Sequence, residues 1–445
     1  MSPDRPTLLL VNPWIHDFAA YDFWARPLGL LTLAGLFREH GFGVRYLDCL
    51  DRFHPRGSRP DPRARHGRGP LHKSEIPVPD VLRGVPRRFR RYGVEPDWFD
   101  ADLQSEPRPD LILVTSIMTY WYPGVRETIE RLRIAFLESP ILLGGIYATL
   151  LPNHAATLGA DRVVTGGDFG EILTVVGEMT GFRPSLKSDP HRVDTWPRPA
   201  LDLQREIPFV PLLTAVGCPF RCAYCASDRL APRRLRRSPD HIRDEIGFWH
   251  DRHGVRDFVF YDDALLLDAD RHALPLLEGV IRAGRSIRFH TPNAVHIREI
   301  DDRMADLLFR SGFHTLRLGL ETAAFEARSQ LDRKVTEEEF RRSVAALKRA
   351  GFPKERVGAY LLAGLPGQSV EAVARSIRVV REAGITPVPA WYTPIPGTPL
   401  WPAAVAAARY DLESDPLLTN NALVPCWPEF SWEVLTRLKR LARGG

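Results

Sequence analysis

The stretch TAVGCPFRCAYCASDRL, residues 214–230, holds three of the five cysteines of the chain within eight residues. Thiolates bind zinc ions or iron–sulfur clusters. A closed zinc site or a ferredoxin-type cluster needs a fourth ligand, and the remaining cysteines, Cys49 and Cys426, are remote in sequence. The spacing Cys218-x-x-x-Cys222-x-x-Cys225 therefore predicts a 4Fe-4S cubane held at three irons, with the fourth iron open. A structural zinc knot or chance clustering is the alternative.

The cysteines directly follow an apolar, strand-like segment at residues 209–216. Five further segments of this kind alternate with helical patterns, at residues 257–261, 286–291, 314–320, 356–364 and 386–393. Ser238-Pro239 and Thr336 to Glu339 have the form of helix starts. Six such units in sequence predict a partial (β/α)6 TIM barrel, whose chemistry lies on the loops after the strands.

The first half of the chain also alternates strands and helices. Strand-like segments occur at residues 7–11, 42–51, 110–116, 140–145 and 161–167. This order predicts an α/β, doubly wound parallel sheet of the Rossmann type, which binds ligands at the carboxyl ends of its strands.

Proline-rich stretches and the loss of strand–helix periodicity predict the domain boundaries. We expect a Rossmann-like domain at 1–185 with an insertion at 51–107, a proline-rich linker at 186–204, the barrel at 205–400 and a C-terminal extension at 401–445. The arginine-rich insertion is too long for an ordinary connection. It is interpreted as a lid, a binding loop or a partly disordered arm, and a solvated loop is the simplest interpretation.

Composition limits the other functions. No apolar run approaches the ~20 residues of a membrane span, and the N-terminus MSPDRPTLLLVNPW lacks the pattern of a signal peptide. We therefore expect a cytoplasmic protein without a membrane span. The net charge of +5 is mild, so charge gives no expectation of nucleic-acid binding.

GCPFRCAYC resembles the cluster-binding motif of the radical S-adenosylmethionine (SAM) enzymes. The resemblance implies that the open iron chelates the methionyl amine and carboxylate of SAM, and that one electron releases a 5′-deoxyadenosyl radical. The SAM-binding residues that it implies are Tyr224, Asp262, Asp263, Asn293, Glu321 and Gly364. Asp262-Asp263 departs from the Gly-Gly-Glu that is usual in the family. The other residues have simpler interpretations: Glu321 as a surface carboxylate, Asn293 as a turn former and Gly364 as a turn glycine.

The first half is similar to the cobalamin-binding domain of the cobalamin-dependent radical SAM enzymes. The residues that this resemblance assigns to cobalamin are Asn12, Ser116, Gly144 and Gly145. The chain lacks the Asp-x-His-x-x-Gly motif of proteins that ligate cobalt by histidine; His16 and His54 are the weak substitutes.

Together the resemblances imply a cobalamin-dependent methyltransferase acting on an unactivated carbon of a small-molecule or peptide substrate. An electron donor such as flavodoxin or ferredoxin would supply the electron. A cyclisation or rearrangement enzyme with the same cofactors, or a cobalamin-free radical SAM enzyme with a vestigial first domain, remain alternatives. A methylthiotransferase is disfavoured, because enzymes of that kind need three more cysteines in the first domain and only Cys49 lies there.

Overall fold

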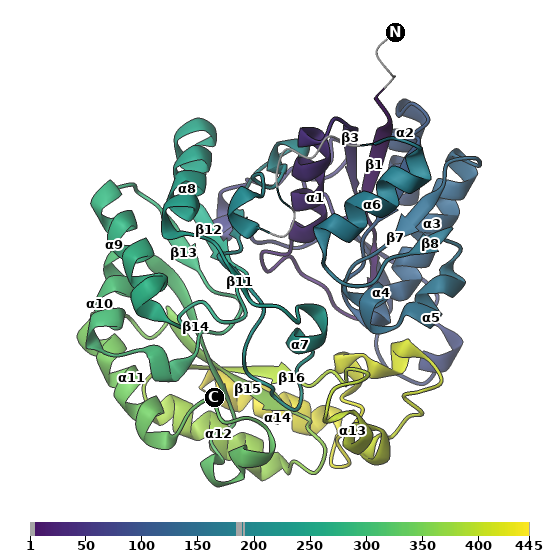
Figure 1. Ribbon diagram of the computed structural model, residues 1–445. Coiled ribbons are helices and arrows are strands. Elements are labelled where there is room, and N and C mark those ends of the chain that lie inside the picture. Colours follow the sequence, from purple (N-terminus) through teal and green to yellow (C-terminus); the bar gives the residue numbers. More distant parts are fainter. Residues whose placement is uncertain (1–4, 184–188, 190–191, 445) are drawn as a thin grey trace. The chain divides into compact units, whose positions relative to one another are not determined.

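The computed structural model describes residues 5–183, 189 and 192–444 (Figure 1). Their contacts divide the chain into two compact units, Met1–Pro208 and Phe209–Gly445. Part of the expected linker, residues 186–188 and 190–191, lies outside the described residues. The end of that segment packs on the first unit, where the Ala200 amide donates to the carbonyl of Leu31.

The first unit is built on a five-stranded parallel sheet with the order β3-β1-β6-β7-β8. Its central strands are short and almost entirely apolar, as expected for strands that are covered on both faces. The strands are β1 (Thr7–Asn12), β3 (Gly43–Asp48), β6 (Leu111–Val114), β7 (Ile141–Leu143) and β8 (Arg162–Val163). The helices are α1 (Leu28–Glu39), α3 (Tyr122–Ala135), α4 (Ile146–Leu150), α5 (Pro152–Ala155) and α6 (Phe169–Thr180).

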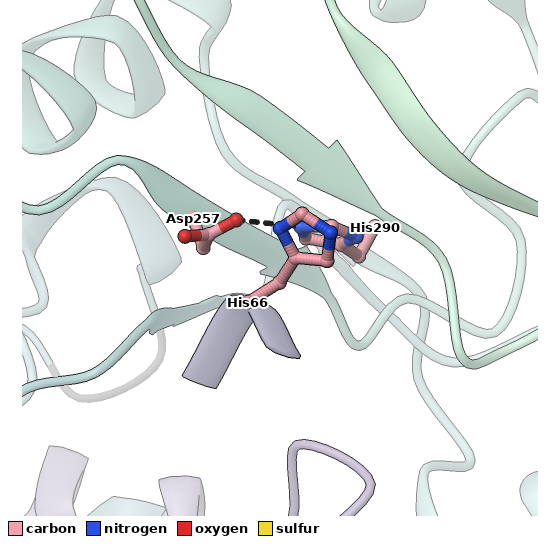
Figure 2. A group of neighbouring side chains, drawn as sticks. All are labelled: His66, Asp257 and His290. Atoms are coloured by element: carbon pink, nitrogen blue, oxygen red, sulfur yellow. Dashed lines mark hydrogen bonds and ion pairs between the residues drawn. The ribbon is translucent and has the colours of Figure 1, made fainter. Parts of the chain in front are cut away.

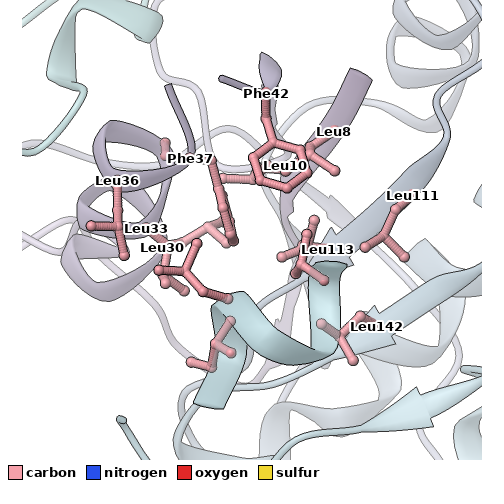
Figure 3. Close-up of a cluster of buried hydrophobic side chains, with 14 of the residues drawn as sticks. Leu8, Leu10, Leu30, Leu33, Leu36, Phe37, Phe42, Leu111, Leu113 and Leu142 are labelled. Carbon is pink, nitrogen blue, oxygen red and sulfur yellow. The ribbon is translucent and has the colours of Figure 1, made fainter. Parts of the chain in front are cut away.

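One face of this sheet packs against α1 and α6. Leu8 and Leu10 of β1 and Leu113 of β6 meet Leu33 and Phe37 of α1 in a continuous buried cluster (Figure 3). Because side chains alternate along a strand, Leu9 and Val11 point to the opposite face, and they are also buried. The doubly wound arrangement therefore follows from strands that are apolar on both faces.

The insertion at 51–107 is folded rather than a solvated loop. Two of its strands, β4 (Lys73–Glu75) and β5 (Arg90–Tyr92), form an antiparallel sheet with β2 (Ile15–Asp17), and α2 (Pro96–Ser105) follows. Glu127 of α3 accepts hydrogen bonds from Arg91 and lies 3.0 Å from Nε2 of His16. Burial alone would raise the pKa of Glu127, but these partners lower it to about 2. The arginines of the insertion thus serve its folding, which sequence alone did not indicate.

The second unit is built on a six-stranded parallel sheet with the order β9-β12-β13-β14-β15-β16. The strands are β9 (Val210–Leu212), β12 (Asp257–Phe260), β13 (Arg288–His290), β14 (Phe313–Glu321), β15 (Val357–Ala363) and β16 (Thr386–Trp391). The expected first strand at 209–216 is wrong in its second half. Ala215–Val216 is a separate strand, β10, and pairs antiparallel with β11 (Leu235–Arg236), because Thr214 leaves the sheet to bind Asp262.

Helices form an outer row along one face of this sheet (Figure 1). They are α8 (Pro239–His253), α9 (Ala273–Ala283), α10 (Asp302–Arg310), α11 (Glu337–Arg349) and α12 (Val370–Glu382). The expected helix starts are confirmed: the Ser238 side chain caps α8, and Thr336 with Glu339 forms a capping box on α11. Phe258, Phe260, Phe289 and Phe313 pack together within the sheet.

The same strands also carry polar side chains that contact one another. Asp257 of β12 lies 2.9 Å from Nε2 of His290 on β13 (Figure 2), and Nδ1 of His290 lies 3.0 Å from the hydroxyl of Thr315. Arg288 makes a bidentate pair with Asp257. Burial raises the pKa of Asp257, but the bonds from Arg288 and His290 outweigh it and lower that pKa. The second unit therefore has a cluster of aromatic side chains and a buried polar network on neighbouring strands.

The C-terminal residues cover part of the second unit. They include α13 (Trp401–Ala407) and α14 (Trp432–Arg443), and α14 packs on α12 and β16. Within the described residues no helix combines the length and the apolar character that a membrane crossing requires.

Candidate functional site

The three cysteines lie on one loop between β10 and the short helix α7 (Ser227–Leu230). Cys222 is buried, Cys218 and Cys225 are partly exposed, and all three are free thiols. The amide of Cys225 donates to the carbonyl of Cys222, which forms a tight turn. Gly217 opens the loop with a φ of 80°, and a Cβ there would lie 2.9 Å from the carbonyl oxygen of Arg233. The sequence therefore needs glycine at this point to turn the chain into the loop.

The loop fits an iron–sulfur cluster better than a single zinc ion. Burial raises the pKa of the Cys222 thiol to about 11, against the opposing charge of Lys334, so a metal is what would hold it as a thiolate. A structural zinc ion takes four protein ligands, and the other two cysteines lie elsewhere: Cys49 is buried in the first unit, and the thiol of Cys426 donates to the carbonyl of Ala404. A cubane held at three irons needs no fourth thiolate from the protein.

Asp262 holds the start of the loop. Its carboxylate accepts hydrogen bonds from the Thr214 hydroxyl at 2.6 Å and from the Ala215 amide at 2.6 Å. Because the Thr214 proton goes to Asp262, His272 donates its Nε2 proton to the Thr214 oxygen, at 2.8 Å. Burial raises the pKa of Asp262 to about 6 in spite of these bonds. Asp262, which the resemblance assigns to SAM, binds the loop backbone with its oxygens, and only 3% of the residue is exposed.

Asp263 differs from its neighbour. It is exposed and lies beside the cysteine loop, where it accepts a hydrogen bond from Ser227. Its charge is close enough to Cys218 to raise the pKa of that thiol, together with burial, which contributes more. Of the two aspartates, Asp263 is the one available to a ligand at the loop.

A segment after β14 supports the loop from a second direction. The Tyr224 hydroxyl donates to Asp332 at 3.2 Å, and the Ala223 amide donates to the carbonyl of Leu331 at 2.8 Å. Arg328 donates to the other oxygen of Asp332 at 2.6 Å. Tyr224, expected at a SAM site, therefore has a structural partner of its own.

Lys334 brings a positive charge to the loop. Its ammonium lies 5.6 Å from the centre of the Tyr224 ring. Burial would lower its pKa, but Glu321, Cys222 and Asp332 raise it. Asp332 and Lys334 were missed in the sequence, where DRKVTEEE resembles any charged helix start.

Glu321 ends β14 in an unusual conformation. Its φ of 62° is in the left-handed region, which is costly for a residue other than glycine. The side chain is buried near Lys334 and Tyr224, and burial raises its pKa. A strained, buried carboxylate at the carboxyl end of a strand is typical of a functional site.

The other two residues expected at SAM lie at neighbouring strand ends. Asn293 follows β13, and its amide donates to the carbonyl of Tyr261 at 2.8 Å. Gly364 follows β15 with a φ of 91°, and a Cβ there would lie 2.5 Å from Cγ1 of Val424. Close packing of the C-terminal segment is therefore sufficient to explain a glycine at position 364.

Three of the expected cobalamin residues come together in the first unit. The Ser116 hydroxyl, after β6, donates to the carbonyl of Gly144, after β7, at 2.6 Å. Gly145 has a φ of 96°, and a Cβ there would lie 2.3 Å from the carbonyl oxygen of Ser116. At Gly144 the nearest atom to an added Cβ is the carbonyl oxygen of Val164, at 3.8 Å. A methyl group at Gly144 would therefore make only an ordinary contact, so this position at the carboxyl edge tolerates more than a hydrogen atom.

The remaining candidate side chains of the first unit contact other residues of the protein. Asn12 is buried and donates to Asp48 at 2.7 Å, which joins β1 to β3. The ring of His54 stacks on Trp98 at 5.1 Å, and His16 pairs with Glu127. Asn12, which the resemblance assigns to cobalamin, thus has a structural partner, and so do the two histidines, neither of which is favoured as a cobalt ligand.

Comparison with known proteins agrees with this geometry. Residues 212–388 match the model of the radical SAM superfamily. The chain is 26% identical over 446 aligned residues to the cytidylyl-2-hydroxyethylphosphonate methyltransferase of Streptomyces wedmorensis, covering 85% of this chain and 78% of the relative. It is 23% identical over 328 residues to an uncharacterized methyltransferase of Pyrococcus horikoshii, covering 67% of this chain and 70% of the relative.

A solved structure shares the fold. The radical SAM methyltransferase TsrM from Kitasatospora setae, solved with cobalamin and a [4Fe-4S] cluster, matches with a TM-score of 0.66 at 18% identity, over 90% of this chain and 75% of TsrM. The match spans both units. Residues 212–388, which include Cys218, Cys222 and Cys225, match a radical SAM domain.

Proposed function

We propose that this protein is a cobalamin-dependent radical SAM methyltransferase that methylates an unactivated carbon. The observation that carries the proposal is the presence, in one chain, of a three-cysteine loop without a fourth cysteine and of a strand edge at which Ser116, Gly144 and Gly145 meet. When bound, the cluster, SAM and cobalamin would supply a carbon radical and a transferable methyl group. Methyltransferases among the relatives support this class.

Each candidate residue has a stated task in this proposal. Cys218, Cys222 and Cys225 hold the cluster, and Asp262 fixes their loop. Asp263, Glu321, Asn293 and the backbone at Gly364 and Tyr224 surround SAM, in an order that follows successive strand ends of a partial barrel. Ser116, Gly144 and Gly145 admit the cobalamin tail. The protein's task is to keep water away from reactive intermediates.

We propose a small-molecule substrate and a flavodoxin- or ferredoxin-type electron donor. Among the relatives, TsrM was solved with tryptophan as its substrate, and the Streptomyces wedmorensis enzyme is named for a cytidylyl-phosphonate. Relatives with such different substrates support a substrate class rather than one compound.

The test is cofactor content after anaerobic purification and reconstitution with iron, sulfide and hydroxocobalamin. We expect about four irons per chain, as in a cubane, and one cobalamin. Cys222→Ala should lose the visible cluster absorption and SAM cleavage, while Cys49→Ala, a buried cysteine of the first unit, should keep both. Zinc in place of iron would contradict the proposal. Iron without cobalamin would leave a radical SAM enzyme with a vestigial first unit.

The reaction type is tested with SAM that carries a deuterated methyl group. Methylation predicts transfer of that methyl group to a substrate together with formation of 5′-deoxyadenosine and S-adenosylhomocysteine. A substrate that changes without gaining the label would indicate a cyclisation or rearrangement instead.

A further inference from the structure

His296 is a buried histidine whose two ring nitrogens have no protein partner among the described residues. It follows β13 and precedes the short 3-10 helix Ile297–Glu299 of the second unit. Only 4% of the residue is exposed, and neither Nδ1 nor Nε2 makes a hydrogen bond. A buried polar group without a partner costs roughly 1–3 kcal/mol. Two such atoms on one ring indicate that something other than the protein satisfies them.

The position of His296 points to the cysteine loop. Its ring stacks on Phe220 with a centroid distance of 4.8 Å and an interplanar angle of 24°. Phe220 lies between Cys218 and Cys222 in the sequence. The guanidinium of Arg298, two residues after His296, lies 5.8 Å from the centre of the Phe220 ring. The segment at 296–298 is thus packed directly against the loop.

The same segment is fixed from its other side. Arg298 donates to the carbonyl of Lys334 at 2.5 Å and to that of Arg333. Lys334 is the cation whose charge acts on Cys222. His296 is therefore held by a rigid set of contacts between the loop and the segment that carries Lys334, so its ring cannot easily turn toward solvent.

The surroundings keep the ring neutral. Burial, together with the charges of Lys334, Arg298 and Arg234, lowers the pKa of His296 to about 3, against the opposing charge of Asp332. A neutral imidazole has one N–H donor and one acceptor nitrogen. Three nearby cations attract an anionic occupant, for which the N–H is the useful atom.

We propose that His296 donates its ring N–H to a sulfur of the iron–sulfur group held by Cys218, Cys222 and Cys225, and thereby raises the reduction potential of that group. This inference rests on the proposed function. Hydrogen bonds to the sulfurs are one of the means by which proteins set the potential of such clusters. A donor stabilises the reduced state more, because reduction adds negative charge.

The test compares two variants in the full chain reconstituted with iron and sulfide, without SAM. His296→Phe keeps the ring on Phe220 and removes both nitrogens, while His296→Gln keeps an N–H donor and removes the ring. The control is His40→Phe, a buried histidine of the first unit whose Nδ1 lies 2.8 Å from the carbonyl of Leu36. The readout is the midpoint potential from an EPR-monitored redox titration, together with iron content.

We expect His296→Phe to hold iron like the wild type, with about a tenfold smaller ratio of reduced to oxidised cluster at a fixed potential. For a one-electron couple this corresponds to a shift of ~59 mV to lower potential. His296→Gln should recover part of the shift, and His40→Phe should show none. Loss of iron in the Phe variant alone, with a near-normal potential in the Gln variant, would also support the donor.

Three outcomes would overturn the inference. An iron-loaded His296→Phe with the wild-type potential would exclude the hydrogen bond, whether or not its affinity for SAM falls. Equal loss of iron in both variants would make His296 a packing residue. A wild-type chain that assembles no cluster would refute the proposed function itself, which is a separate and earlier result of the same experiment.

Discussion

Asp262 and Asp263 are neighbours in the chain with different surroundings. Asp262 is buried and accepts hydrogen bonds from Thr214 and Ala215, whereas Asp263 is exposed beside the cysteine loop. Consecutive side chains leaving a strand point in opposite directions. One carboxylate can therefore fix the loop while the other is available to a ligand.

Substitution of each aspartate by asparagine should separate these tasks. Asp262→Asn should lower the free energy of unfolding by roughly 1–3 kcal/mol, because a buried acceptor is replaced by an amide that brings a donor. Asp263→Asn should leave stability within about 0.5 kcal/mol and weaken SAM binding about tenfold. Denaturant unfolding and SAM titration of the reconstituted protein measure the two effects. Equal effects of both variants on SAM binding would contradict this division.

Asp262 also predicts a pH dependence. Burial raises its pKa from 3.8 to about 6, so the folded chain binds this proton more tightly than the unfolded chain. The contribution is fully present below about pH 4 and is lost as pH rises through 6. At 1.36 kcal/mol per pH unit it amounts to roughly 3 kcal/mol.

The measurement is the difference in unfolding free energy between the wild type and Asp262→Asn at several pH values from 4 to 7. This difference should change over the stated window and remain flat above it. A constant difference across the whole range would show that the carboxyl has an ordinary pKa.

Among the elements, the ends of β6 and β7 determine what the first unit can bind. The Ser116 hydroxyl bonds to the carbonyl of Gly144 and so fixes the two strand ends together. Gly145 has no room for a side chain, while a Cβ at Gly144 would make only an ordinary contact, 3.8 Å from the carbonyl oxygen of Val164. Adjacent glycines thus differ: one is required by the backbone, and the other is not.

Alanine at these two glycines should have distinct effects. Gly145→Ala should destabilise the protein by roughly 1–3 kcal/mol or more, because of its positive φ and the clash with Ser116. Gly144→Ala should leave the melting temperature nearly unchanged and reduce cobalamin affinity about tenfold. Thermal unfolding and cobalamin absorbance after gel filtration distinguish the two. Full cobalamin retention in Gly144→Ala would remove this edge from the proposed tail site.

At the scale of the whole molecule, the proposed cluster and cobalamin residues lie in different compact units. The Ser116–Gly144–Gly145 edge belongs to Met1–Pro208, and the cysteine loop belongs to Phe209–Gly445. Each unit has its own sheet and its own buried side chains. Loss of one cofactor should therefore leave the other site folded.

We accordingly expect the full-length Cys222→Ala variant to bind cobalamin to at least half the wild-type level without holding iron. Gly144→Ala should show the reverse, with full iron and reduced cobalamin. Iron analysis and the cobalamin spectrum of the same samples give both values. Simultaneous loss of both cofactors in either variant would show that the two sites depend on each other.

Local features of the sequence predicted a large part of this protein. Three cysteines within eight residues must share one loop, whatever surrounds it. The strands at 110–116, 257–261 and 356–364 were recognisable because buried parallel strands are short and apolar. Ser116, Gly144 and Gly145 were named from the resemblance to cobalamin-binding domains, and they meet because strand ends of a parallel sheet lie along one edge.

Only the tertiary structure decided which distant residues join the loop. Asp332, Lys334 and His296 lie far from the cysteines in sequence, and they join the loop because the segments after β13 and β14 leave the same parallel sheet as the segment after β9. Tertiary packing likewise gave Asn12 and Gly364 partners within the fold and folded the insertion at 51–107. The physical reason is range: spacing along the chain fixes contacts within a turn or a strand, whereas contacts between elements depend on the order in which the strands pair.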